Sequence, residues 1–516
     1  MKNILEWLEG TCARIPDKRA FSDDVSAVTF AELVRGAKQA GTFLAGKIRP
    51  REGAAFYLEK STLAIRGMFG AAYAGGFYSL LDTRQPAARL EKILSVLTPR
   101  VILTDRENEK KARELFGELV FAGEDGEELR PEIAVLEDIF ENGTVDEPKL
   151  FALRAQALDI DPLYVNFTSG STGVPKGVAV CHRSVIDFIT PFVSLFDIRE
   201  SDVIGNQAPF DFDVSVKDIF SGIATGAEVA IIPRSYFSVP TKLMDYLVEK
   251  EATVLTWAVS AMCFVSIMNG FDYKVPSKVR RVMFSGETMP VKQLNVWKKY
   301  LPDAVYVNLY GPTEITCNCT YHVLDRDYAN GENIAIGRPF PNEKVFLLDD
   351  GDRLVTEPGV PGEICVSGTA LALGYYRNPE KTAAAFVQNP LNDRYPETIY
   401  RTGDLGKYDE AGDLFYISRK DFQIKHLGHR IELGEIETTV QALSGVTRAC
   451  CLFDSEKKRL LLFYTGEREK KALMKELRSL LPPFMLPNTL FPLAEMPMTK
   501  NGKIDRKALG ELGGIA

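Results

Sequence analysis

The residues between 168 and 177 combine three kinds of group that bind phosphate. The segment reads Thr-Ser-Gly-Ser-Thr-Gly-Val-Pro-Lys-Gly and follows an apolar run at 163–167. Its glycines let the backbone approach a ligand closely, its hydroxyl and backbone N–H groups can donate to phosphate oxygens, and Lys176 adds a positive charge. It differs from the loop of nucleoside triphosphatases, because Gly177 and not a hydroxyl residue follows the lysine. Composition alone is equally typical of a surface loop, so the assignment depends on the rest of the chain.

Composition excludes several classes of protein. The 516 residues carry 62 Lys and Arg against 70 Asp and Glu, a net charge of −8, which argues against a nucleic-acid surface. The eight cysteines are too sparse for a disulfide framework, and neither they nor the four histidines have zinc-site spacing. The chain contains no signal-peptide pattern and no apolar run of membrane-spanning length. We therefore expect a cytoplasmic protein with no membrane span.

Short apolar runs alternate with helical periods along most of the chain. Strand-like runs at 54–58, 77–81 and 101–103 are separated by helix-like periods at 62–74 and 86–97. The alternation recurs at 202–232, 242–270 and 279–310. This pattern predicts an α/β fold, with mostly parallel sheets covered by helices.

The alternation of strand-like and helix-like segments ends near residue 350. Short apolar runs at 345–348, 363–367 and 414–417 lie between Gly, Asp and Pro, which favours antiparallel strands and a small β-barrel part. A further α+β pattern begins near residue 421. We therefore predict a large N-terminal domain at 1–420 and a small, mobile C-terminal domain at 421–516.

Further segments resemble motifs of the adenylate-forming enzymes, which include acyl-CoA synthetases, luciferases and nonribosomal-peptide adenylation domains. The 168–177 segment is similar to their phosphate-binding loop, and the other matches occur in the family's order over residues 25–509. These are Tyr-Gly-Pro-Thr-Glu at 310–314, Tyr-Arg-Thr-Gly-Asp-Leu at 400–405, Arg-Lys-Asp-Phe-Gln-Ile-Lys at 419–425, Gly-His-Arg-Ile-Glu-Leu-Gly-Glu-Ile-Glu at 428–437 and Asn-Gly-Lys-Ile-Asp-Arg at 501–506.

The resemblance implies a site for ATP and Mg²⁺. In the family, a substrate carboxylate attacks the α-phosphate of ATP and pyrophosphate leaves, so cations and oriented donors are needed. Glu314 is the implied Mg²⁺ ligand and Thr313 the implied contact to the α-phosphate. The residues implied to bind ATP are Thr168, Ser169, Gly170, Ser171, Thr172, Gly173, Lys176, Asn308, Tyr310, Gly311, Asp404, Tyr416 and Arg419.

The resemblance also implies two half-reactions and a moving domain. Lys503 would bridge the substrate carboxylate and the α-phosphate, although its Asn-Gly-Lys context is also typical of an exposed turn. The C-terminal domain would rotate about Asp421 and bring the Gly428 segment into the site for thioester formation. The implied acceptor is the phosphopantetheine thiol of a separate carrier protein, because no carrier segment occurs in the chain.

The sequence around Asp213 favours the amino-acid-activating branch of this family. Its context, Phe-Asp-Val-Ser-Val at 212–216, resembles segments in which the aspartate pairs with the substrate α-ammonium. The same aspartate could instead cap a helix. The implied side-chain pocket consists of Val214, Lys217, Thr256, Met283, Ser285, Leu309, Cys317 and Asn318.

Lys217 is the most informative residue of this implied pocket. A buried lysine needs an anion or loses its charge, so the pocket suits a polar or acidic side chain, unless Lys217 points out of it. The resemblance leaves three alternatives open: a D-alanine–carrier protein ligase that serves a cell-wall polymer, an acyl-CoA-synthetase-like ligase, and a non-catalytic nucleotide-binding scaffold. Lys217 and Asn318 fit the small apolar pocket of the first alternative poorly, and that ligase has cysteine where this chain has Ser285.

Overall fold

The computed structural model describes residues 1–123, 126–170, 174–420, 422–499 and 504–515. These form two compact units. The first comprises 1–83, 97–166 and 178–420, and the second comprises 84–96, 167–177 and 421–516. The division at 420 and 421 that the sequence suggests stays a prediction.

The first unit contains a nine-stranded mixed sheet whose central strands are parallel. In spatial order its strands are β17 (Arg338–Pro339), β16 (Thr320–Val323), β15 (Val305–Tyr310), β14 (Arg281–Ser285), β13 (Val254–Ala258), β11 (Val203–Asn206), β12 (Glu228–Ile231), β1 (Arg19–Ser22) and β2 (Ala27–Thr29).

A seven-stranded sheet follows the alternation that the sequence predicts between residues 53 and 104. In spatial order its strands are β21 (Gly374–Tyr375), β10 (Lys176–Cys181), β9 (Pro162–Thr168), β4 (Phe77–Leu81), β3 (Gly53–Tyr57), β5 (Val101–Thr104) and β8 (Glu132–Val135). A separate short pair is formed by β6 (Phe121–Ala122) and β7 (Glu128–Leu129).

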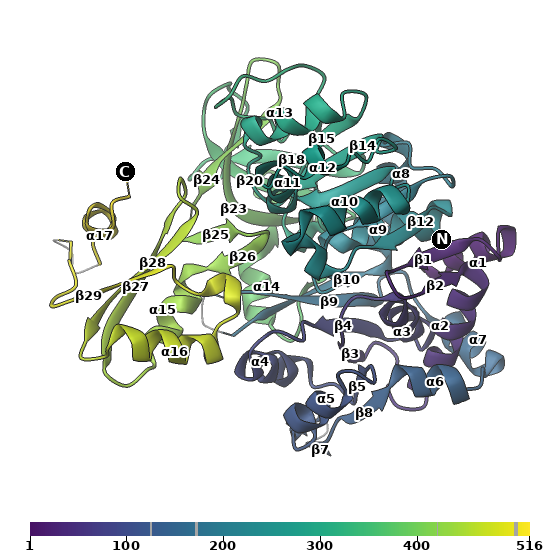
Figure 1. Ribbon diagram of the computed structural model, residues 1–516. Coiled ribbons are helices and arrows are strands. Elements are labelled where there is room, and N and C mark those ends of the chain that lie inside the picture. Colours follow the sequence, from purple (N-terminus) through teal and green to yellow (C-terminus); the bar gives the residue numbers. More distant parts are fainter. Residues whose placement is uncertain (124–125, 171–173, 421, 500–503, 516) are drawn as a thin grey trace. The chain divides into compact units, whose positions relative to one another are not determined.

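One hydrophobic core joins residues of both large sheets with the helices that lie along them (Figure 1). Phe30 and Leu33, Met68 and Phe69, and Phe220 are among its completely or almost completely buried members. The helices that contribute are α1 (Leu5–Arg14), α2 (Phe30–Leu44), α3 (Thr62–Tyr73), α6 (Leu136–Asn142), α7 (Glu147–Gln156), α8 (His182–Leu195) and α9 (Val214–Thr225).

Helix α2 shows how local sequence sets an element of this core. Thr29 precedes the helix and accepts a hydrogen bond from the backbone of Glu32, whose carboxylate accepts from the Thr29 backbone. This capping box satisfies two of the N–H groups that a helix start leaves unpaired. The apolar face of the helix then packs into the core, so the start and the orientation of α2 both follow from its sequence.

A second core covers another part of the nine-stranded sheet with the teal helices of Figure 1. Trp257 of β13 and Trp297 of α13 meet edge to face in it. The helices are α10 (Pro240–Glu249), α11 (Val259–Ile267), α12 (Gly270–Tyr273) and α13 (Val291–Tyr300), and α5 (Glu109–Phe116) lies elsewhere in the unit. Among the described residues, no helix has both the length and the apolar character needed to cross a membrane.

The antiparallel strands predicted at 345–348, 363–367 and 414–417 belong to a six-stranded sheet of the first unit. Its strands are β19 (Leu354–Val355), β18 (Glu343–Leu348), β20 (Gly362–Gly368), β23 (Thr398–Tyr408), β22 (Phe386–Gln388) and β24 (Leu414–Arg419), and α14 (Pro379–Ala385) precedes β22. The mixed α/β fold with an antiparallel part that the sequence predicts is therefore confirmed.

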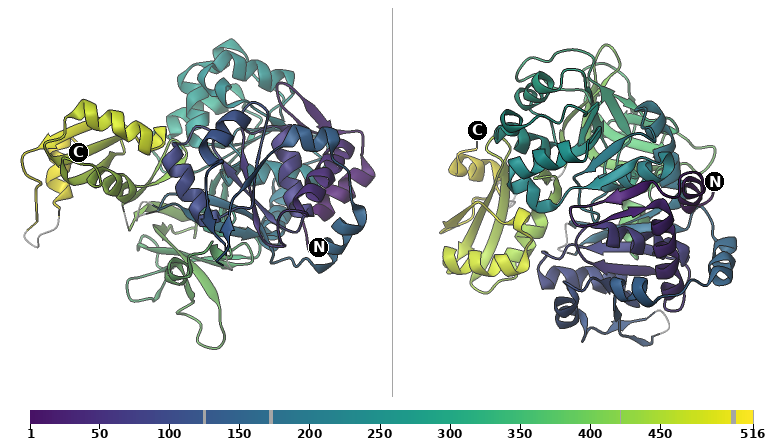
Figure 2. Two further views of the ribbon diagram at one scale, coloured as in Figure 1. Left: turned by 90° about the horizontal axis from the view of Figure 1, so that it is seen from below. Right: turned by 45° about the vertical axis from the view of Figure 1, so that its right-hand side comes forward.

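The second unit contains a three-stranded sheet with helices on both faces, drawn in yellow in Figure 2. The sheet consists of β27 (Val446–Asp454), β28 (Arg459–Gly466) and β29 (Thr489–Leu493). Helices α15 (Leu433–Gln441) and α16 (Lys470–Leu480) pack on one face and α17 (Arg506–Gly513) on the other. The unit also contains the hairpin of β25 (Gln423–His426) and β26 (His429–Glu432), and most of α4 (Ala87–Leu97).

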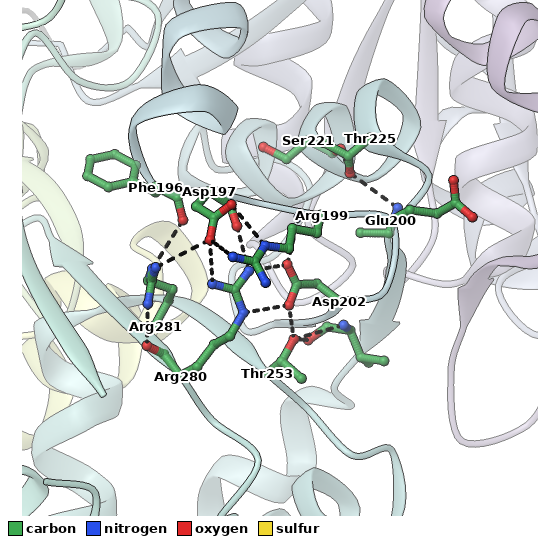
Figure 3. A network of polar contacts seen from close by, with 12 residues as sticks. Phe196, Asp197, Arg199, Glu200, Asp202, Ser221, Thr225, Thr253, Arg280 and Arg281 are labelled. Carbon is green, nitrogen blue, oxygen red and sulfur yellow. Dashed lines mark hydrogen bonds and ion pairs between the residues drawn. The ribbon is translucent and has the colours of Figure 1, made fainter. Parts of the chain in front are cut away.

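A network of charges ties the loop after α8 to β13 and β14 (Figure 3). Arg280 donates to both carboxylate oxygens of Asp202, at 2.9 and 2.5 Å, and the Thr253 hydroxyl donates to the same carboxylate at 2.8 Å. Burial alone would raise the pKa of Asp202, but the hydrogen bonds from Arg280 and from the Arg199 backbone lower it below its ordinary value. The ionised form of Asp202 is therefore stabilised in the folded protein.

Replacing Asp202 by Asn should destabilise the first unit by about 2 kcal/mol at neutral pH, because Arg280 loses a charged partner. The measurement is the urea midpoint of unfolding. Since the folded pKa of Asp202 is lowered, its contribution is present above the unfolded pKa of about 3.9 and is lost as the pH falls through the folded value. The midpoints of wild type and variant should thus converge in acid.

The matched control is Asp327→Asn, since the Asp327 side chain is 98 % exposed and pairs with Lys298 on the surface. This change should cost less than about 0.5 kcal/mol. Equal destabilisation by the two substitutions would contradict a special role for the Asp202 network.

Candidate functional site

The carboxyl ends of three neighbouring parallel strands bring together residues that are distant in the sequence. The register places Thr256 of β13 beside Met283 of β14, and Ala258 beside Ser285. The next pair in the sheet places Phe284 of β14 beside Asn308 of β15. In open α/β sheets this edge is where ligands bind, so the predicted substrate and nucleotide residues share a typical location.

Lys217 lies on the first turns of α9 and is completely buried. Its Nζ donates to Oδ1 of Asn318 at 2.7 Å and to Oγ of Ser285 at 3.3 Å. The structure thus brings together three residues of the implied side-chain pocket. We call Lys217, Ser285, Asn318 and the adjacent Cys317 the side-chain cluster.

Asp213 stands immediately before α9 and is 5 % exposed. Burial and the negative charge of Asp213 raise the pKa of the Cys317 thiol to about 12, against the opposing effect of Lys217. Asp213 and Lys217 therefore both act on the same thiol. The alternative of a helix cap receives no support, because no side-chain cap hydrogen bond forms at Asp213.

The other residues of the implied side-chain pocket contact the protein core or residues outside the side-chain cluster. Val214 is 3 % exposed and follows Asp213 in α9, whereas Met283 and Leu309 belong to the large hydrophobic core. The Thr256 hydroxyl bonds to the buried carboxyl of Asp218, whose pKa is raised to about 7 by burial. Thr256 thus has a partner outside the side-chain cluster.

A second group of polar residues surrounds Asp404, which is 1 % exposed. Arg419 donates to its Oδ1 at 2.7 Å, and the Tyr310 hydroxyl donates to its Oδ2 at 2.5 Å. Burial and the Asp404 charge together raise the pKa of Tyr310 well above its ordinary value, so Tyr310 stays a donor. A carboxylate has about four acceptor directions, so Asp404 can still accept from further hydroxyls.

The remaining residues implied to bind adenine and ribose lie near this group. The Tyr416 ring is tilted toward Tyr310, with 6.4 Å between ring centroids. Asn308 donates from Nδ2 to the Ala335 carbonyl at 2.8 Å. Gly311 has no room for a side chain, because a Cβ there would lie 2.5 Å from Cα of Asn318. The chain after β15 can therefore pass this close to the 317–319 segment only because residue 311 is glycine.

Thr313 and Glu314 lie in the short 3₁₀ turn η2 (Thr313–Ile315). Glu314 is completely buried, and its Oε1 accepts from the Tyr375 hydroxyl at 2.8 Å. The described residues offer no group of three or more His, Cys, Asp or Glu side chains that could hold a metal. Mg²⁺ typically binds one or two carboxylates together with substrate phosphates, so a single carboxylate at Glu314 fits that ion.

The turn between Glu314 and the side-chain cluster is strained. Thr316 and Cys317 have φ angles of +54° and +85°, a region that costs a non-glycine residue about 1–3 kcal/mol. The Thr316 hydroxyl donates to the Ala370 carbonyl at 2.6 Å and so helps to hold this conformation. The strained turn orients Asn318 toward Lys217, which links the nucleotide motif directly to the side-chain cluster.

The implied phosphate-binding residues lie in the second unit. Ser169 donates from Oγ to the Arg430 carbonyl at 2.7 Å and accepts from the Glu432 backbone at 3.1 Å. The Thr168 hydroxyl lies 3.5 Å from the Lys176 carbonyl. The implied residues Ser171, Thr172, Gly173, Asp421 and Lys503 lie outside the described residues. Gly428 forms the tip of the β25–β26 hairpin with Leu427, and both have positive φ.

Several polar residues at these sites were not singled out by the sequence. Tyr375 donates a hydrogen bond to Glu314, but no pattern in the sequence around Tyr375 indicates this role. Glu432 and Glu435 lie inside the 428–437 motif, and their spacing of three residues at a helix start indicates one shared face. Arg89 pairs with Glu435, and no local pattern identifies it.

Comparison with known proteins agrees with this arrangement. The profile of the family described as "AMP-binding enzyme" matches residues 8–376. The chain is 32 % identical to Zwittermicin A synthase ZmaJ of Bacillus cereus, over 99 % of this chain and 95 % of ZmaJ.

Two solved structures share the fold. The Vibrio cholerae adenylation domain AlmE, in complex with glycyl-adenosine-5'-phosphate, is 21 % identical, with a TM-score of 0.83 over 99 % of this chain and 97 % of AlmE. Holo-PA1221, an NRPS protein containing adenylation and PCP domains, is 24 % identical, with a TM-score of 0.81 over 99 % of this chain and 84 % of its own. The family match and the ZmaJ relationship carry the assignment beyond fold: the chain belongs to the AMP-binding enzymes and is an adenylate-forming ligase.

Proposed function

We propose that this ligase activates an amino acid to aminoacyl-AMP, with release of pyrophosphate, and transfers it to the phosphopantetheine thiol of a separate carrier protein. The observation that carries the proposal is the presence of a buried acid and a buried base close together in the sequence at the start of α9. Asp213 provides a charge partner for a substrate ammonium, and Lys217 lies one helical turn further along. Fatty-acid and aromatic-acid substrates have no ammonium group, so they would offer the Asp213 carboxylate no positively charged partner.

In the first half-reaction a substrate carboxylate oxygen forms a bond to the α-phosphorus of ATP. The bond from that phosphorus to the bridging oxygen breaks, and pyrophosphate leaves with the electron pair. Negative charge grows on the phosphoryl oxygens, so donors held in place before the reaction lower the barrier. Mg²⁺ at Glu314 would supply a Lewis acid to these oxygens. Thr313 would donate to the α-phosphate, and Lys503 would bridge both reactants.

Nucleotide binding in this proposal depends on the group around Asp404. Its carboxylate would accept from ribose hydroxyls with the lone pairs that Arg419 and Tyr310 leave available. Arg419 also forms an ion pair with the buried carboxylate of Asp404. Tyr310 and Tyr416 would contribute apolar faces to adenine, and Asn308 and Gly311 would line the same site.

We further propose that the substrate side chain is acidic. Lys217 donates to Asn318 and Ser285 and also bonds to the Cys317 thiol, so none of its described hydrogen-bond partners is a carboxylate. The Ser285 hydroxyl and the Asn318 Nδ2 are donors as well. The side-chain cluster therefore offers donors and a positive charge, and a carboxylate satisfies both, whereas an amide or hydroxyl satisfies only the hydrogen bonds.

The second half-reaction is supported by motif and fold only. The Gly428 hairpin matches the segment that enters the site for thioester formation in the resembled family. The fold is shared with PA1221, an NRPS protein containing adenylation and PCP domains. A carrier thiolate would attack the aminoacyl carbonyl carbon, and AMP would leave as the acyl–oxygen bond breaks. The carrier would act in trans.

Amino-acid-dependent pyrophosphate exchange should single out aspartate or glutamate among the twenty L-amino acids and D-alanine. Replacing Lys217 by Gln should then lower kcat/KM for the acidic substrate by about 30-fold, because a charge-assisted hydrogen bond is lost. The matched control is Lys110→Gln, since the Lys110 side chain is 90 % exposed. Exchange with D-alanine alone would refute the acidic pocket and favour a D-alanine–carrier protein ligase.

Replacing Lys503 by Ala should abolish aminoacyl-AMP formation and leave ATP affinity within about threefold of wild type, because its implied contacts strengthen only as the transition state forms. The measurements are single-turnover adenylate formation and equilibrium binding of a non-hydrolysable ATP analogue. Lys507→Ala, in the same C-terminal segment, is the control. Adenylate formation at the wild-type rate in the Lys503 variant would remove this lysine from the mechanism.

A further inference from the structure

Within the second unit, the described part of the phosphate-binding loop contacts an acidic segment of the same unit. We call residues 430–435, which end β26 and begin α15, the acidic segment. Ser169 is bonded to both the Arg430 carbonyl and the Glu432 N–H. One side chain of the loop therefore fixes two backbone groups of the acidic segment.

Two carboxylates of the acidic segment meet the donors of the loop. The Gly170 N–H donates to Oε2 of Glu435 at 3.3 Å, and Lys176 Nζ lies 3.6 Å from Oε1 of Glu432. Gly170 can offer this N–H because it has no side chain: a Cβ there would lie 2.1 Å from the Val174 carbonyl oxygen. A hydroxyl, a backbone N–H and an ammonium group of one loop are thus all directed at residues 430–435.

The pairing of Glu435 is almost completely buried. Its second oxygen accepts from Arg89, and the two side chains are 4 % and 7 % exposed. Burying a carboxylate is tolerated only when charge and hydrogen bonds compensate it. Glu435 therefore uses both oxygens, one on a cation and one on the loop, in the way that an anionic ligand uses its oxygens.

A phosphate group would need the same donors. Backbone N–H groups, hydroxyls and a lysine are the elements of a phosphate site, and a carboxylate offers charged oxygens of similar hydrogen-bonding character. One N–H group makes one strong hydrogen bond at a time. The β- and γ-phosphates of ATP and the acidic segment therefore cannot both use Gly170 and Lys176 fully.

We propose that Glu435, with Glu432, takes the place of departed pyrophosphate on the loop, so that the acidic segment docks there only after pyrophosphate has left. The inference rests on the proposed function, because it takes the loop as the site of the β- and γ-phosphates. Glu435 is then a positioning residue: it holds residues 428–437 in place for the second half-reaction. Binding of pyrophosphate and docking of the acidic segment oppose each other equally in both directions.

Hydrogen exchange of the wild-type protein tests the inference without a substitution. The probe is inorganic pyrophosphate with Mg²⁺, and no amino acid is added. The Glu432 N–H is bonded to Ser169, so peptides covering 428–437 should be protected in the protein alone. Saturating pyrophosphate should increase their exchange rate about fivefold or more, and peptides of β27 and β28 should not change.

A charge-neutral variant gives the reciprocal measurement. Glu435→Gln weakens the competing anion, so its affinity for pyrophosphate, measured by calorimetry, should rise about fivefold or more. The control is Glu437→Gln on the same helix, because Glu437 pairs with Arg506 and the Cys451 backbone. That variant should bind pyrophosphate like the wild type.

The outcomes separate this inference from the proposed function. Faster exchange at 428–437 together with tighter binding by Glu435→Gln supports the competition. Pyrophosphate binding without either effect overturns it, whatever the amino-acid exchange assay shows. Absence of pyrophosphate binding to the wild type also overturns it, and the amino-acid-dependent assay then decides the proposed function independently.

Discussion

Buried charges in each of the two units depend on compensation by nearby groups. Asp404, Glu314, Lys217 and Glu435 are each at most 3 % exposed, where an unpaired charge would cost several kcal/mol. Arg419 and Tyr310 compensate Asp404, and Arg89 compensates Glu435. Lys217 differs from these, because its described hydrogen-bond partners are the oxygens of Asn318 and Ser285 and the Cys317 thiol. In the function that we propose, a substrate carboxylate supplies the charged hydrogen-bond partner of Lys217, and specificity then follows from the same constraint.

The large sheets supply the geometry that this compensation requires. Parallel strands end at one edge, so Ser285 and Asn308 are placed by the register of β13, β14 and β15 and not by their own local sequence. Asp213, immediately before α9, and Lys217, in its first turns, come from the segment between β11 and β12. The strained turn at Thr316 and Cys317 positions Asn318. Strain of this kind persists only where surrounding contacts hold it, here the Thr316 hydroxyl on Ala370 and the close approach of Gly311.

The periodicity of the sequence was sufficient to predict helices and strands, but it was insufficient to predict which strands pair with each other. The runs at 54–58, 77–81 and 101–103 correspond to β3, β4 and β5, because alternating strands and amphipathic helices have distinct local patterns. Nothing local indicates that β1 pairs with β12, some two hundred residues away. For the same reason the motifs identified Glu314 and Asp404, whereas Tyr375 and Arg89 became visible only through their contacts.

In the competition that we propose, the loop at 168–177 binds two anions in turn. Its described donors are the Ser169 hydroxyl, the Gly170 N–H and the Lys176 ammonium group, which can bond to the oxygens of a phosphate or of a carboxylate. A loop whose side chains were shaped to fit one ligand could instead distinguish a phosphate from a carboxylate. The Gly170 N–H bonds to Glu435, and under our proposal competition between Glu435 and pyrophosphate for this donor would set the order of the two half-reactions.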